Sequence, residues 1–156
     1  MTRVYWDAML FVYLLDGNPV YEADVKRLAN QIEARGDRLC TSVFTVGEVL
    51  TGPHKNRRPE AAARARDFFR GGVVELLPLT FETAERYAQV RAAFGVKQAD
   101  GVHLATASVA EVDLFITNDH QLLKLRVPGI KFMSGLDGRI TWEAQNEMRR
   151  RWWTEV

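Results

Sequence analysis

Four acidic residues stand where an α/β protein can gather oxygen ligands for a divalent cation. Asp7 directly follows the short apolar segment RVYW, and Asp119 comes soon after a second one, LFIT. Glu48 lies inside the segment SVFTVGEVL, and Asp100 stands near the start of a predicted helix, in KQADGVHLATA. In open parallel sheets, ligands bind beyond the carboxyl ends of the strands. The order of the elements therefore permits the four carboxylates to meet in one cleft.

Carboxylates that share a cleft repel one another, which raises some of their pKa values or requires a bound cation. Hard oxygen ligands with few or no histidines suit magnesium or manganese rather than zinc. Cys40 is the only cysteine, which excludes both a cysteine-based zinc site and an intrachain disulfide. A magnesium or manganese ion can activate a water molecule and neutralise the charge that develops on a phosphodiester. The pattern thus favours metal-dependent phosphodiester hydrolysis.

Each acidic residue also has a simpler interpretation when it is taken alone. An aspartate in the first turn of a helix usually caps free backbone N–H groups and is favoured by the helix dipole. That reading applies to Asp7, Asp100 and Asp119. Glu48 could be an exposed side chain on a helix edge, although its neighbours are apolar and glutamate is rarely buried without a partner. Sequence alone leaves both interpretations open.

Two further side chains could support the acidic set. Thr117 could orient Asp119 or a metal-bound water by hydrogen bonding, or it could simply suit a strand. His103 lies one turn beyond Asp100, so both could face one cleft. For His103 we favour a structural or supporting role over general acid or base catalysis.

Strands and helices are expected to alternate along the chain. Strands are predicted at 3–6, 39–42, 73–77, 114–117 and 130–133. Helices are predicted at 7–15, 21–35, 43–51, 59–70, 80–94 and 99–110, with a short helix after Asp119. The third helix should end at Gly52-Pro53 and leave a basic loop at 54–58. This order predicts an α/β fold, a three-layer α/β/α sandwich with a mostly parallel central sheet.

The 156 residues suit a single domain at 1–138, followed by a basic tail helix at 139–156 that packs on the domain or at an interface. The apolar run 8–15 is too short to span a bilayer and is followed by turn residues, so we predict a cytoplasmic protein without a membrane segment. The net charge of +1 says nothing about nucleic acid. Residues 51–70, however, hold six basic against two acidic side chains, which could be a phosphate-contacting patch or a solvated helix face.

At the four acidic residues the chain resembles the PIN-domain family, and most of all the VapC-type toxins of prokaryotic toxin–antitoxin systems. The resemblance covers about residues 3 to 133, through VYWDAMLFVYLL, SVFTVGEVL, ADGVHLATA and DLFITNDHQLL in that order. It implies a metal-binding set and, just before its last member, a hydroxyl residue: Asp7, Glu48, Asp100, Asp119 and Thr117. It further implies a magnesium- or manganese-dependent endoribonuclease that cleaves RNA with metal-activated water, a cognate antitoxin, and a homodimer.

One departure from the family pattern concerns Ala8, where many relatives carry serine or threonine. The leading hypothesis is a ribonuclease toxin held silent by its antitoxin. The alternatives are a housekeeping RNA-processing or DNA-flap nuclease, and an inactive PIN-like scaffold that binds RNA or protein. The presence of all four acidic residues argues against the scaffold, whereas Ala8, which lacks the hydroxyl of many relatives, is compatible with it. A phosphotransferring hydrolase of the haloacid type is disfavoured, because Met9 stands where a second aspartate is needed.

Overall fold

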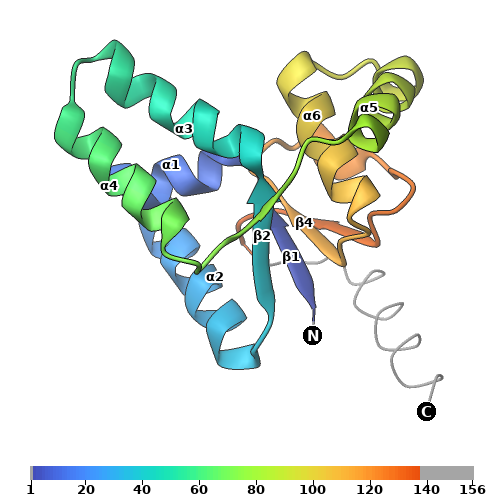
Figure 1. The fold of residues 1–156 in the computed structure, drawn as a ribbon. Helices are drawn as coiled ribbons and strands as arrows, with labels where there is room; N and C mark the ends of the chain where they lie inside the picture. Colours follow the sequence, from blue (N-terminus) through green and yellow to red (C-terminus); the bar gives the residue numbers. More distant parts are fainter. Residues whose placement is uncertain (1, 138–156) are drawn as a thin grey trace.

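A five-stranded parallel sheet forms the centre of the molecule in the computed structural model, which describes residues 2–137 (Figure 1). Its strands are β1 (Arg3–Trp6), β2 (Arg38–Ser42), β3 (Glu75–Leu77), β4 (Leu114–Ile116) and β5 (Phe132–Ser134). Their order is β3-β2-β1-β4-β5, and each neighbouring pair is parallel. The first strand along the chain is therefore the central strand, and the carboxyl ends of all five share one edge.

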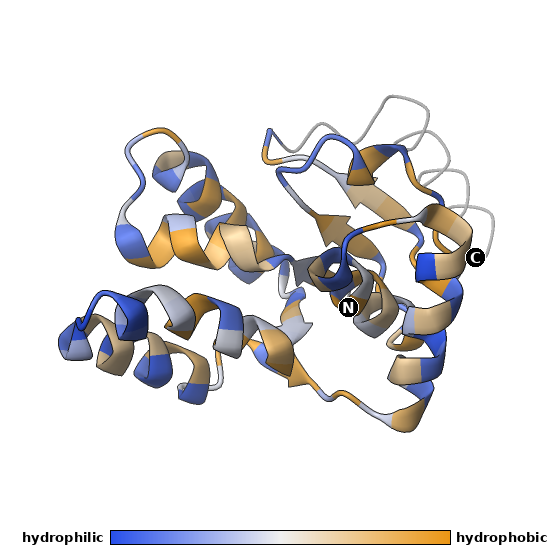
Figure 2. Cartoon of the chain, turned by 90° about the horizontal axis from the view of Figure 1, so that it is seen from above, coloured by the Kyte–Doolittle hydropathy of each residue, from blue (hydrophilic) through white to orange (hydrophobic). Residues whose placement is uncertain are grey.

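Helices cover both faces of the sheet, which confirms the predicted three-layer α/β/α architecture (Figure 1). One layer contains α1 (Ala8–Asp16), α2 (Glu22–Arg35), α3 (Val43–Lys55) and α4 (Pro59–Arg70). The other contains α5 (Phe81–Phe94) and α6 (Gln98–Val109), with the short 3-10 helix η1 (Leu122–Lys124) after β4. The strands are mostly hydrophobic, whereas the helices alternate between hydrophilic and hydrophobic residues, as amphipathic covering helices do (Figure 2).

Two hydrophobic cores lie on opposite sides of β1, because side chains alternate along a strand. Val4 and Trp6 pack into the core under α1–α4. Tyr5 faces the other way, into the core under α5 and α6, where its ring stacks on Phe115 with centroids 4.9 Å apart. Burial on both faces is expected of a central strand in a parallel sheet. It also means that a side chain of β1 can reach residues of α6.

The predicted end of the third helix at Gly52-Pro53 is wrong by one turn, since α3 continues to Lys55. Proline removes one helical hydrogen bond, because it has no N–H group to donate to the preceding turn. The backbone N–H of Asn56 donates to the carbonyl of Gly52 at 2.9 Å, which closes the last turn. The basic loop accordingly shrinks to residues 56–58, at the tip of the α3–α4 hairpin.

The remaining boundaries shift by one to two residues, and β3 and β5 in particular begin at Glu75 and Phe132. The apolar run 8–15 forms most of α1 and packs in the core. Within residues 2–137, no helix is long and apolar enough to cross a membrane. The tail predicted at 139–156 lies outside the described residues.

Close packing between α5 and α6 fixes the start of α6, where Asp100 lies. A Cβ atom at Gly101 would lie 2.9 Å from Cε2 of Tyr87 and 3.0 Å from Cγ of Arg91. Any other residue at this position would require these two side chains of α5 to shift. The Arg91 guanidinium also donates from Nε to the carbonyl of Val96 at 3.0 Å, which ties the α5–α6 connection to α5.

Candidate metal centre

Asp7 stands at the carboxyl end of β1 and serves two neighbours at once. Its Oδ1 accepts a hydrogen bond of 3.0 Å from the N–H of Met9 and so caps α1. Its Oδ2 accepts a hydrogen bond from the hydroxyl of Thr117, which follows β4. Its own N–H donates to the carbonyl of Ile116 at 3.2 Å, in continuation of the β1–β4 pairing. The capping interpretation thus holds for Asp7, and it does not exclude a place in a functional site.

Thr117 connects two of the acidic residues. Its side chain is buried, and its hydroxyl donates to Asp7 while accepting a 3.1 Å hydrogen bond from the N–H of Asp119. Asp119 itself begins a turn, since its Oδ1 accepts from the N–H of Gln121 at 2.9 Å. The ends of the neighbouring strands β1 and β4 therefore hold Asp7 and Asp119 in a fixed relation through one hydroxyl group.

Glu48 reaches the site from α3 on the β2 side, and Asp100 reaches it from the first turn of α6. Oε1 of Glu48 lies 2.5 Å from Nε2 of His103. Asp100 lies in the first turn of α6, as expected, but it is not the cap, because Lys97 occupies the cap position and makes no side-chain bond there. Within the described residues, no hydrogen bond to the Asp100 carboxylate is present.

The electrostatics of the site link the acidic residues to one another. Burial raises the pKa of Asp100 above its ordinary value, and the neighbouring carboxylates of Asp119 and Glu48 raise it further. Burial also raises the pKa of Asp7, with an added contribution from Asp100, against the lowering effects of the Thr117 hydroxyl and of His103. Asp100 thus links the four side chains into one electrostatic group, because the carboxylates of Asp119 and Glu48 raise its pKa and its own carboxylate raises that of Asp7.

The chemistry of this donor set fits a hard divalent cation, because four carboxylates supply only oxygen ligands and need positive charge. As the side chains stand, no three His, Cys, Asp or Glu residues of the described part of the chain are placed to hold one ion together. Glu48 is turned to His103, and both oxygens of Asp7 accept hydrogen bonds. Magnesium usually keeps several waters and needs only one or two protein carboxylates, so direct ligands could come from part of the set.

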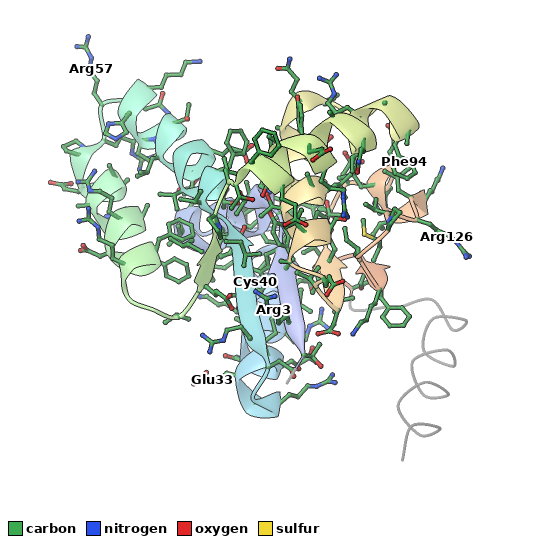
Figure 3. All side chains as sticks on the ribbon, turned by 45° about the vertical axis from the view of Figure 1, so that its right-hand side comes forward. Arg3, Glu33, Cys40, Arg57, Phe94 and Arg126 are labelled. Atoms are coloured by element: carbon green, nitrogen blue, oxygen red, sulfur yellow. The ribbon has the colours of Figure 1, made fainter. Side chains whose placement is uncertain are left out.

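An open pocket of about 390 Å³ lies beside two of the acids. Its lining combines these acids with apolar and polar side chains: Phe94, Val96, Lys97, Asp100, Asp119, Gln121, Leu122 and Leu125. Phe94 lies at the end of α5 beside this pocket (Figure 3).

Sequence reasoning missed one residue of this region, Tyr5. Its position in a strand indicated only a core side chain, and it is indeed fully buried. Its hydroxyl, however, lies 2.6 Å from Nδ1 of His103 and accepts a 3.1 Å hydrogen bond from the N–H of Ser42. A buried tyrosine hydroxyl usually requires a partner, which is the signal that could have directed attention to it.

Comparison with known proteins places the chain among characterised folds. The family model of the PIN domain matches residues 4–128. Among curated proteins, none matches the chain.

Solved structures with a similar fold include VapBC2 from Rickettsia felis bound to a DNA fragment from its promoter, with a TM-score of 0.67 and 16% identity over 86% of this chain and 98% of that one. A toxin–antitoxin complex from Klebsiella pneumoniae gives a TM-score of 0.62 and 22% identity, over 81% of this chain and 94% of that one. VapC20 from Mycobacterium tuberculosis, described as a sarcin–ricin loop cleaving toxin, gives a TM-score of 0.59. Its sequence identity is 16%, over 72% of this chain and 86% of that one. With the family match over most of its length and the same fold in these structures, the chain belongs to the PIN domain family.

Proposed function

We propose that this protein is a metal-dependent endoribonuclease that hydrolyses RNA phosphodiester bonds and acts as the toxin of a toxin–antitoxin pair. The observation that carries the proposal is the electrostatic group of Asp7, Glu48, Asp100 and Asp119 at the carboxyl edge of the sheet in a PIN fold. The similar structures support the toxin role, since two of them are toxin–antitoxin assemblies and a third is described as a sarcin–ricin loop cleaving toxin.

Some residues of the site would bind the metal ion, and others would contact the RNA. A bound magnesium or manganese ion would activate a water molecule and neutralise the charge that develops on the phosphodiester. Asp7 and Asp119, fixed by Thr117, and Asp100 would supply its ligands, with Glu48 opposite them on α3. The pocket beside Asp100 and Asp119 offers an apolar wall for one base of the RNA.

A basic tip on the α3–α4 hairpin would contact the flanking phosphates. Lys55, Arg57 and Arg58 are exposed there, and Arg57 extends from the hairpin into solvent (Figure 3). Phosphate contacts supply most of the sequence-independent affinity of a protein for nucleic acid. This tip suits a substrate that is longer than the nucleotides at the acidic site.

The proposed protein partners are a cognate antitoxin and a second copy of the chain, in the cytoplasm where the RNA target lies. Along the β3 edge of the sheet, apolar side chains are exposed, namely Val73, Leu76 and Leu79, and Phe81 at the start of α5 is 87% exposed. Exposed apolar side chains beside an unpaired strand edge favour contact with another protein.

Incubation of the purified protein with total cellular RNA tests the nuclease proposal. We expect cleavage in Mg²⁺ or Mn²⁺, none in EDTA, and none by Asp119→Asn purified in the same way. Asp67→Asn, which changes an exposed aspartate on α4 away from the acidic group, should cleave like the wild type. A folded protein that is free of bound inhibitor and cleaves under no condition would instead favour a binding scaffold.

Expression of the protein in a bacterial host without its antitoxin tests the toxin role separately. We expect the wild type to arrest growth and Asp119→Asn to leave growth unaffected, because the arrest would depend on RNA cleavage. Equal amounts of the two proteins must be verified in the cells. Harmless expression of a wild type that cleaves RNA in vitro would indicate a housekeeping nuclease.

A further inference from the structure

A buried chain of hydrogen bonds leads from β1 to the acidic site through His103. The imidazole is 4% exposed and lies on α6, with Nε2 at 2.5 Å from Oε1 of Glu48 and Nδ1 at 2.6 Å from Oη of Tyr5. The rings of Tyr5 and Phe44 meet the imidazole edge-on, each with centroids 5.9 Å away. These contacts fix both the plane of the ring and the direction of its two nitrogen atoms.

The direction of the hydrogen bond to Glu48 follows from the carboxylate, which can accept but not donate. Nε2 of His103 is therefore the donor to Oε1 of Glu48. On the other side of the ring, Nδ1 is held at 2.6 Å by Oη of Tyr5, and this oxygen also accepts from the N–H of Ser42 at 3.1 Å.

We infer that Tyr5 and His103 are positioning residues that present Glu48 to the acidic site. Tyr5 holds the Nδ1 side of the imidazole, and the Nε2–H on its other side donates to Oε1 of Glu48. The other carboxylate oxygen, Oε2, is left for the site, on a side chain that is 29% exposed. The role of Glu48 in the nuclease rests on the proposed function, whereas the hydrogen bonds of His103 do not.

Filling of the space between Tyr5 and Phe44 does not by itself explain why His103 is a histidine. Buried polar groups cost free energy unless each finds a partner, and an apolar residue would fill the space between the two aromatic rings equally well. Here the hydroxyl of Tyr5 and both ring nitrogens of His103 have hydrogen-bond partners, in a line from Ser42 to Glu48. Residues that orient a metal-binding side chain by such hydrogen bonds typically change metal affinity by about 10- to 100-fold when they are replaced.

Nitrogen-15 NMR of the metal-free protein at neutral to mildly alkaline pH tests the hydrogen bond to Glu48 directly. We expect His103 to show a protonated Nε2, the nitrogen atom that faces the carboxylate. His54, exposed near the end of α3, provides the reference for a histidine without such partners. An unprotonated Nε2 of His103 would overturn the inference. This readout does not depend on whether the protein is a nuclease.

Manganese binding to three purified variants tests the positioning of Glu48. His103→Gln can donate to Glu48 and accept from Tyr5, and we expect it to bind Mn²⁺ within about 3-fold of the wild type. His103→Leu fills the space without a donor, and its affinity should fall by about 10- to 100-fold. His54→Leu is the matched control and should bind like the wild type.

Thermal unfolding of each variant separates positioning from folding. A purely structural histidine predicts that the Mn²⁺ affinities of His103→Gln and His103→Leu follow their stabilities, and that result would overturn the inference. Wild-type affinity in a folded His103→Leu would overturn it as well. If the wild type binds no Mn²⁺, the proposed metal-dependent function fails, and the NMR result still decides whether Tyr5 and His103 hold Glu48 as inferred.

Discussion

Asp100→Asn is expected to lower metal-dependent RNA cleavage by about 10²- to 10³-fold, because a lost carboxylate ligand removes several kcal/mol of electrostatic stabilisation from the transition state. Asp100 borders the pocket beside the acidic group, and no hydrogen bond within the described residues holds its carboxylate. Asparagine has the same shape but no charge. The loss should therefore affect the reaction and not the fold. Single-turnover cleavage of one RNA substrate in Mn²⁺, by wild type and variant side by side, measures it.

The same substitution should make the metal-free protein more stable at neutral pH. Burial, and then the carboxylate of Asp119, raises the pKa of Asp100 above the ordinary value of 3.8. The folded state therefore binds the Asp100 proton more tightly than the unfolded state does. A group of this kind stabilises the fold below its unfolded pKa, and the contribution disappears as the pH rises through its folded pKa. The asparagine side chain of the variant cannot ionise, so the variant avoids this loss.

Thermal unfolding in EDTA as a function of pH tests whether Asp100→Asn is more or less stable than the wild type. Asp100→Asn should melt above the wild type at neutral pH, and the difference should shrink on acidification and vanish below the unfolded pKa. Added Mn²⁺ should reverse the order, because an ion that binds only the folded wild type stabilises it by about 2.7 kcal/mol at a concentration 100 times its Kd. Asp67→Asn should follow the wild type throughout. A variant that melts lower than the wild type at neutral pH would contradict the electrostatic account.

The positions of the acids at the ends of the strands could be predicted because they depend on local order in the chain. Asp7 and Asp119 each come soon after an apolar strand, and parallel strands bring their carboxyl ends to one edge. Thr117 was predicted from its place two residues before Asp119 and from the resemblance to the PIN-domain family. The capping alternative could not be decided, because it depends on side-chain direction. Asp7 caps a helix and takes part in the acidic group, whereas Asp100 does not cap.

The contacts across the layers could not be predicted, since they depend on how α3 and α6 pack over the sheet. Helical spacing placed His103 one turn after Asp100, but its partner Glu48 is 55 residues away along the chain. Tyr5 is separated from His103 by 98 residues and had the pattern of an ordinary strand residue. The end of α3 was misjudged for a related reason, because the hydrogen bonds that close its last turn beyond Pro53 leave no mark in the local sequence.

Thr117→Val should destabilise the metal-free protein by roughly 3 kcal/mol and weaken Mn²⁺ binding in the same variant. Valine has nearly the same shape as threonine, so the change removes the hydroxyl and little else. The buried carboxylate of Asp7 loses a donor, at about 1.5–3 kcal/mol for a hydrogen bond to a charged group, and the N–H of Asp119 loses its acceptor. Urea denaturation measures the free energy of unfolding, and calorimetric titration measures the affinity for Mn²⁺.

Thr117→Ser is the matched control, because it keeps the hydroxyl and removes only a methyl group. Its stability should fall by about 1 kcal/mol for the lost buried methyl, and its Mn²⁺ affinity should stay near that of the wild type. The comparison of the two variants isolates the hydroxyl that joins β1 to β4. If Thr117→Val binds Mn²⁺ as tightly as Thr117→Ser, the bridge between Asp7 and Asp119 does not organise the ligands, and Thr117 is then a strand residue whose hydroxyl serves only the fold.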